Sequence, residues 1–132
     1  MKKGNNIKII VVDDDLEIKN LIKMALQKEG YDVSGFTNPL AALEYFKINY
    51  NDCDLVITDL RMPEMDGLEL SKNVKLIDPK TKVLLMTAFE ISDDIRFASH
   101  KENHVIDDFI GKPITIKKLY TLVDSHLKGN YS

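Results

Sequence analysis

Five short apolar runs, separated by stretches of helical periodicity, constrain the fold of this chain more than any other feature. They are residues 7–12, 31–36, 55–58, 83–86 and 105–110. Three of the runs are nearly continuous and rich in Val, Ile and Leu, which is typical of strands buried on both faces of a parallel sheet. Between the runs, apolar residues recur every three or four positions, as on one face of a helix. The alternation predicts an α/β domain with a mostly parallel sheet and helices on both of its faces.

Helix start and stop residues stand at the expected boundaries. Gly30 ends the first helix, and Asn38-Pro39 opens the second with a cap and a first-turn proline. Asp78-Pro79 ends the third helix, and Ser92 could start a fourth. The pattern therefore predicts five strand–helix units.

Length, charge and cysteine content limit the classes of function. A chain of 132 residues fits one domain, predicted to span 7–128 with loose ends at 1–6 and 129–132. With 18 basic and 21 acidic residues the net charge is −3, which argues against a nucleic-acid surface. No apolar run approaches the ~20 residues of a membrane span or the core of a secretory signal. The single Cys53 cannot form an internal disulfide. We therefore expect a cytoplasmic protein that binds neither nucleic acid nor membrane.

Polar side chains follow the ends of four expected strands. In chain order they are Asp13 to Asp15, Asp59, Thr87 and Lys112. Ligands bind at the carboxyl ends of parallel strands, so these groups are expected to converge at one edge of the sheet. Converging carboxylates repel one another unless a cation is present, and Mg²⁺ prefers oxygen ligands and often shares its site with phosphate. Lys112 suits a phosphoryl group, and a carboxylate can be the nucleophile that forms an aspartyl phosphate.

Four segments, in this order, resemble the receiver domain of two-component response regulators. They are IIVVDDD at 9–15, DLVITDLRMPEMDG at 54–67, MTA at 86–88 and DDFIGKP at 107–113. The resemblance covers residues 7–127 and implies a doubly wound, five-stranded parallel sheet of order 2-1-3-4-5 with five helices, a flavodoxin-like receiver fold. It further implies a phosphorylation-activated switch in a phosphorelay, which is not an enzyme beyond assisting its own phosphorylation and dephosphorylation.

The resemblance also implies how the acidic residues act. Asp59 would be the phosphoacceptor. Asp13 and Asp14 would hold Mg²⁺, with Mn²⁺ as a substitute, one of them directly and the other through water. Asp59 and the main-chain carbonyl of Arg61 would complete the protein ligands of the metal.

A second group of residues would bind the phosphoryl oxygens and transmit the change. The resemblance assigns Thr87, Ala88 and Lys112 to the phosphoryl group and Phe109 to an aromatic switch. It also implies a cis peptide bond between Lys112 and Pro113. On phosphorylation the aromatic ring would turn inward and reshape the surface of the fourth helix, fifth strand and fifth helix.

The partners implied are a sensor histidine kinase or a phosphotransfer protein as phosphodonor, with a small acyl phosphate as an alternative donor. The output would be a downstream protein target, a missing output domain or a phosphorylation-dependent homodimer. The sequence leaves open the identity of the kinase and the target. It also leaves open whether the chain acts alone or is a piece of a longer regulator.

Other classes fit the residues less well. A haloacid dehalogenase-type phosphatase needs a threonine that is absent after Asp13, and an EF-hand loop needs a glycine where Ile18 stands. The glycines form neither a dinucleotide fingerprint nor a P-loop. A non-phosphorylated receiver-like interaction module remains the alternative, although every key residue of an active receiver is present. Asp107 and Asp108 are interpreted as surface charges.

Overall fold

The computed structural model describes residues 7–88 and 105–127 and contains a five-stranded, wholly parallel sheet in the order β2-β1-β3-β4-β5. The strands are β1 (Lys8–Val12), β2 (Asp32–Phe36), β3 (Leu55–Asp59), β4 (Lys82–Thr87) and β5 (Asp108–Gly111). The helices are α1 (Leu16–Lys28), α2 (Pro39–Asn49), α3 (Gly67–Ile77) and α5 (Ile116–Leu127), with a 3-10 turn, η2 (Tyr50–Asp52), after α2. The predicted fold class and sheet order are confirmed.

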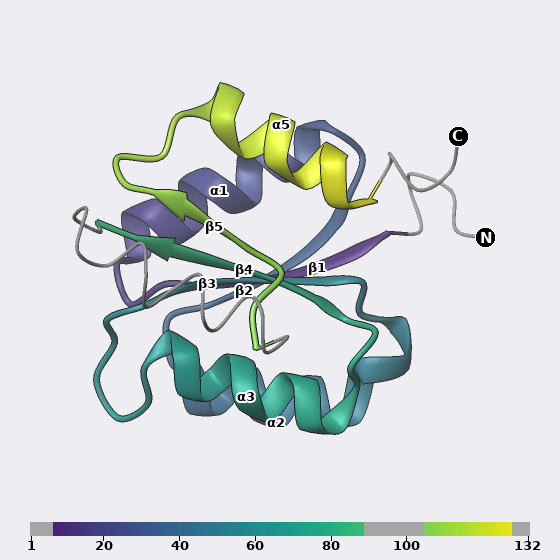
Figure 1. Ribbon diagram of the computed structural model, residues 1–132. Helices are drawn as coiled ribbons and strands as arrows, with labels where there is room; N and C mark the ends of the chain where they lie inside the picture. The colour runs from purple at the N-terminus through teal and green to yellow at the C-terminus, as the bar shows by residue number, and fades with distance from the viewer. Residues whose placement is uncertain (1–6, 89–104, 128–132) are drawn as a thin grey trace.

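Helices cover both faces of the sheet, as Figure 1 shows: α1 and α5 lie on one face, and α2 and α3 lie on the other. The side chains of β1 alternate between the two layers. Ile9 and Val11 belong to the core under α1 and α5, whereas Ile10 and Val12 belong to the core over α2 and α3. This two-sided burial explains why the strand runs are continuously apolar.

Side chains cap the starts of three helices, and the predicted cap at Asn38 is one of them. Asp15 and Asn38 each accept hydrogen bonds from the N–H groups two and three residues further on, at the starts of α1 and α2. Asp66 caps α3 in the same way, through the N–H three residues on. Gly30 follows α1 with a φ of +92°, a left-handed conformation that glycine adopts without steric cost.

The start of β5 differs from the prediction. Pairing with β4 begins at Asp108 and not at residue 105, although Ile106 is buried in the core over α2 and α3. The apolar run at 105–110 therefore includes buried residues that precede the strand as well as residues of the strand. For the other four strands, each limit differs from the predicted one by at most one residue.

The interpretation of Asp107 and Asp108 as surface charges is wrong. The Asp107 side chain is 19% exposed, and its carboxylate lies 2.6 Å from the Lys75 ammonium of α3. Asp108 lies 3.1 Å from His126 of α5. Both carboxylates instead join β5 to the helices on either side of the sheet.

Some predictions fall outside the described residues. The expected fourth helix, starting at Ser92, is one of them, and so are the loose ends. Among the described residues, no helix has both the length and the apolar content needed to cross a membrane.

Candidate functional site

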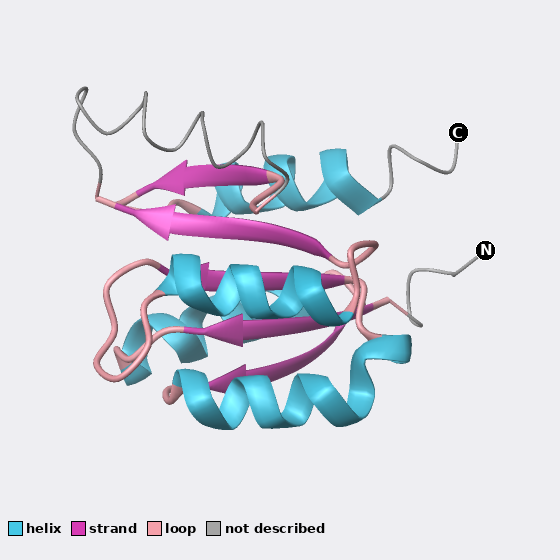
Figure 2. Cartoon of the chain, turned by 60° about the horizontal axis from the view of Figure 1, so that its bottom comes forward, coloured by secondary structure: helices cyan, strands magenta, loops and turns pink. Residues whose placement is uncertain are grey.

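The strand ends bring the predicted polar residues to one edge of the sheet. Figure 2 shows the arrowheads of the parallel strands at this edge. Asp59 and Thr87 are the last residues of β3 and β4, and Asp13 and Lys112 directly follow β1 and β5. The parallel register carries all four residues to the same edge of the sheet, as the sequence predicted.

Three carboxylates form the acidic part of the site. One oxygen from each of Asp13, Asp14 and Asp59 lies within 4.8 Å of the other two. Asp13 is fully buried and Asp59 is buried, whereas Asp14 is exposed. An all-oxygen donor set with one solvent-facing member fits Mg²⁺, which keeps several waters when it binds to protein carboxylates.

Lys112 brings a positive charge into this cluster from β5. Its ammonium lies 3.0 Å from Asp59 Oδ1 and 3.5 Å from Asp13 Oδ2. The side chain is 22% exposed. Lys112 thus connects the ends of β1, β3 and β5. Its ammonium is in direct contact with the carboxylate of Asp59, the predicted nucleophile.

Burial and mutual contacts shift the pKa values of these groups. Burial raises the pKa of Asp13, and the charge of Asp59 adds to this effect; the Asp15 N–H and Lys112 oppose it only in part. Burial alone would lower the pKa of Lys112, but its hydrogen bond to Asp59 and the charges of both carboxylates outweigh burial and raise it. Lys112 is therefore charged at neutral pH.

Main-chain contacts hold the two buried aspartates in place. Asp59 Oδ1 accepts a hydrogen bond from the Leu60 N–H at 3.0 Å, and Asp13 Oδ1 accepts one from the Asp15 N–H at 2.9 Å. At the start of α3, a Cβ atom on Gly67 would collide with the carbonyl oxygen of Asp59 and with the side chain of Leu85. Glycine at this position lets α3 approach the backbone of the phosphoacceptor candidate.

The ends of β4 and β5 carry the residues assigned to the phosphoryl group and the switch. The carbonyl oxygen of Thr87 accepts a hydrogen bond from the Lys112 N–H at 2.8 Å, which holds the two strand ends together. Ala88 follows as an exposed residue, and Phe109 is partly buried against the core over α2 and α3. The Lys112–Pro113 peptide bond is cis, in agreement with the expectation from the resemblance.

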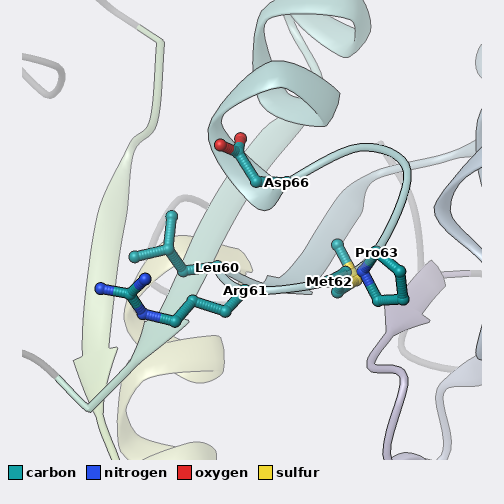
Figure 3. Close-up of a pocket in the computed structure, with 5 residues that line it drawn as sticks. All are labelled: Leu60, Arg61, Met62, Pro63 and Asp66. Atoms are coloured by element: carbon teal, nitrogen blue, oxygen red, sulfur yellow. The ribbon is translucent and has the colours of Figure 1, made fainter.

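The loop between β3 and α3 carries Arg61. Figure 3 shows the side chains of Leu60 and Arg61 on one side of this loop and those of Met62 and Pro63 on the other. Arg61 is exposed, whereas Leu60 and Met62 are buried and anchor the loop. The roles assigned to the Arg61 carbonyl, Thr87 and Phe109 stay predictions.

A family model of the response regulator receiver domain matches residues 9–124. Among curated proteins, the chain is 35% identical to sporulation initiation phosphotransferase F of Bacillus subtilis (strain 168) over 122 residues, covering 92% of this chain and 94% of that protein. It is 38% identical to transcriptional regulatory protein ZraR of Klebsiella oxytoca over 116 residues, covering 88% of this chain. The matched part is only 25% of the length of ZraR.

Solved structures show the same architecture. A response regulator receiver domain protein from Clostridium thermocellum superposes with a TM-score of 0.83 at 27% identity, covering 95% of this chain and 97% of that one. The chemotaxis protein CheY4 of Vibrio cholerae, at 24% identity, shares the fold with a TM-score of 0.81, covering 92% of this chain and 98% of its own. Since the family match spans most of the chain, and a relative of similar length is aligned almost from end to end, this chain belongs to the response regulator receiver domain family.

Proposed function

We propose that this chain is a phosphorylation-activated switch of a two-component phosphorelay, with Asp59 as the phosphoacceptor. The observation that carries the proposal is the Lys112 ammonium 3.0 Å from Asp59, within a cluster of three carboxylates. A site built only to hold a metal gains nothing from a cation on one of its ligands. A site that receives a phosphoryl group gains a partner for the incoming negative oxygens.

The proposed transfer forms one bond and breaks another. A carboxylate oxygen of Asp59 attacks phosphorus, and the bond from phosphorus to the donor breaks, with its electron pair leaving on the donor. The donor is a phosphohistidine of a kinase or phosphotransfer protein, or a small acyl phosphate. Mg²⁺, held by Asp13, Asp14, Asp59 and the carbonyl of Arg61, would supply charge neutralisation at the phosphoryl oxygens.

Lys112 and Thr87 would then hold the product. The ammonium of Lys112 exchanges its carboxylate partner for a phosphoryl oxygen, and the Thr87 hydroxyl, with the backbone at Ala88, binds another. Phosphorylation adds about −2 charge, which strengthens the hydrogen bonds that these groups donate to the phosphoryl oxygens. Moving a population from 1:99 to 99:1 requires ~5.5 kcal/mol. Charge-assisted hydrogen bonds contribute ~1.5–3 kcal/mol each, so two or three are sufficient.

The output of the switch would pass through Phe109. This side chain lies in β5, two strand positions before Gly111 and next to the strand end that carries Lys112. Receiver domains act with histidine kinases or phosphotransfer proteins and with output domains or partner proteins. For this chain we propose a protein target, an output domain or a second copy, with no direct contact to nucleic acid and no catalytic activity beyond its own phosphorylation and dephosphorylation.

Intact-mass spectrometry after incubation with acetyl phosphate tests the proposal. With Mg²⁺, the wild type should gain one phosphoryl group, which hydroxylamine should remove because an aspartyl phosphate is an acyl phosphate. Chelation of the metal or the change Asp59→Asn should abolish the gain. Asp52→Asn, which alters an exposed aspartate of η2, is the matched control and should behave like the wild type.

The alternative function, a non-phosphorylated interaction module, predicts a different result in this experiment. A folded wild type that gains no phosphoryl group from acetyl phosphate or from a phosphorylated histidine donor, with or without Mg²⁺, would contradict the switch. Such a protein would be a receiver-like interaction module.

A further inference from the structure

A second ion pair joins β5 to the rest of the fold at the strand's opposite end. Just before β5, the carboxylate of Asp107 lies 2.6 Å from the Lys75 ammonium of α3, which also donates to the carbonyl oxygen of Thr81 at 2.8 Å. The side chains of Lys75 and Asp107 are 13% and 19% exposed, so solvent screens this pair less than a surface pair. The strand that carries Lys112 is therefore held at both ends by charged contacts.

Asp107 also forms hydrogen bonds with the main chain of β4, just before the ladder between β4 and β5 begins. Its N–H donates to the Val83 carbonyl at 2.8 Å, and its side-chain Oδ2 accepts from the Val83 N–H at 2.8 Å. One residue thus satisfies both main-chain groups of Val83. The next residues pair in the ordinary ladder, from Leu84 with Asp108 to Thr87 with Gly111. The contact fixes which residue of β5 faces which residue of β4.

The register of β5 needs such a contact. Within the part of the chain that the structure describes, β5 is an edge strand of only 4 residues and pairs with β4 alone. A slip by one residue would move Lys112 along the strand by ~3.3 Å and turn alternate side chains to the other face. The ammonium would then lose its 3.0 Å contact with Asp59.

We propose that Asp107, held by Lys75, is a positioning residue for the phosphoryl site: it sets the register of β5 so that Lys112 reaches Asp59. The proposal rests on the function proposed above for Lys112. A comparison within the fold supports it. At the start of β2, at the other edge of the sheet, the pair Lys8–Asp32 is about half exposed at 3.4 Å, and none of the site side chains named above comes from β2. The less exposed pair, Lys75–Asp107, accompanies the strand that leads to Lys112.

A comparison of two ligands distinguishes a positioning role of Asp107 from a general effect on stability. Beryllofluoride, a tetrahedral phosphoryl analogue, would contact Lys112, whereas Mg²⁺ would bind to the carboxylates that follow β1 and end β3. Asp107→Ala should weaken beryllofluoride binding, measured by NMR titration in saturating Mg²⁺, by about tenfold or more, since a charge-assisted hydrogen bond is misplaced. Its Mg²⁺ affinity should equal that of the wild type. Asp32→Asn, the matched control on β2, should leave both affinities unchanged.

Two further variants make the test decisive. In a Lys112→Ala background, Asp107→Ala should cause no additional loss of beryllofluoride affinity, because the residue acts only through Lys112. Asp107→Asn keeps an oxygen for the Val83 N–H but loses the ion pair. It should fold and should show faster hydrogen exchange at the Lys112 amide, with β1 and β3 amides unchanged.

The opposite results overturn the positioning role. They are unchanged beryllofluoride affinity in both Asp107 variants, an equal loss in the presence and absence of Lys112, or unaltered exchange at the Lys112 amide in Asp107→Asn. If the wild type accepts a phosphoryl group while any of these holds, only the positioning role fails. A wild type that neither accepts a phosphoryl group nor binds beryllofluoride removes the proposed function and, with it, this inference.

Discussion

At the scale of single residues, Asp13 combines two properties that conflict when no cation is bound: it is fully buried, and its proposed role as a metal ligand requires it to be ionised. Its carboxylate has Lys112 at 3.5 Å, but Asp59 competes for the same ammonium at 3.0 Å. The net result is the raised pKa of Asp13, in which burial is the largest cause. A residue that suits a metal thus destabilises the metal-free fold.

The pH dependence of stability follows from this shift. Because the pKa of Asp13 is higher in the folded than in the unfolded state, the folded state binds more protons between the two values, and its stability falls as pH rises through the folded pKa. Asp13→Asn removes this loss. In metal-free buffer, the variant should be more stable than the wild type at neutral pH, and the difference should shrink as pH falls towards the unfolded pKa of 3.8. Urea unfolding at several pH values measures it; a difference independent of pH would contradict the assignment to Asp13.

Lys112 gives a second prediction at this scale. Replacement by methionine keeps the apolar stem but removes the ammonium from Asp59 and from the incoming phosphoryl group. The initial rate of phosphorylation by acetyl phosphate should fall by about 10²–10³-fold, as when one preorganised donor to a developing charge is lost. Lys80→Met, an equal change of charge at an exposed position, should leave the rate unchanged. Equal rates in both variants would show that Lys112 does not act on the phosphoryl group.

At the scale of elements, the first turn of α3 decides how close the helix lies to the backbone of Asp59. Gly67 sits against the Asp59 carbonyl oxygen, and its N–H donates to the Leu60 carbonyl at 2.8 Å. Gly67→Ala should lower the free energy of unfolding by about 1–3 kcal/mol, the usual cost of overpacking, and should slow phosphorylation because Asp59 must shift.

Gly35→Ala is the matched control for this prediction. A Cβ atom there would meet the flexible aliphatic stem of Lys19, which can move aside. Its effect on unfolding should be small. Urea unfolding of both variants, with phosphorylation followed by mass spectrometry, checks the pair; equal destabilisation by the two changes would show that the contact of α3 with Asp59 is not the cause.

The elements also show how far sequence predicts structure here. β1 and β3 were predicted to within one residue because both are buried on two faces and therefore continuously apolar. The same signal misplaced the start of β5, since Ile106 is buried without belonging to the ladder. The site itself was predictable, because parallel strands carry their following residues to one edge.

No sequence pattern predicted the contact between Lys75 and Asp107. The two residues are 32 positions apart. Lys75 lies in no motif, and Asp107, although it opens the segment 107–113, precedes a strand and does not follow a strand's carboxyl end. A lysine near the end of a helix and an aspartate before a strand resemble ordinary surface charges in a sequence. Only the packing of α3 beside the start of β5 shows that they meet, with little exposure to solvent.

At the scale of the whole molecule, metal binding at the proposed site would be linked to folding. The three carboxylates come from segments that directly follow β1 and end β3, so the site exists only when the sheet is assembled. A ligand that binds only the folded state stabilises it by RT ln(1 + [L]/Kd), about 2.7 kcal/mol at 100 times Kd. Mg²⁺ at that ratio should raise the free energy of unfolding of the wild type by this amount.

Two variants, Asp13→Asn and Asp15→Asn, test whether Mg²⁺ stabilises the fold through this site. Asp13→Asn should gain little stability from Mg²⁺, so the order of stability found in metal-free buffer should reverse when the cation is added. Asp15→Asn, a neighbouring change that keeps the cap of α1, should respond to Mg²⁺ like the wild type, because asparagine and aspartate cap helices about equally well. Thermal unfolding of the three proteins over a Mg²⁺ titration, at constant ionic strength, measures both effects. An equal gain in all three would place the cation elsewhere. Reversal in Asp13→Asn alone would tie it to the carboxylates beside Asp59, where the proposed phosphoryl transfer needs it.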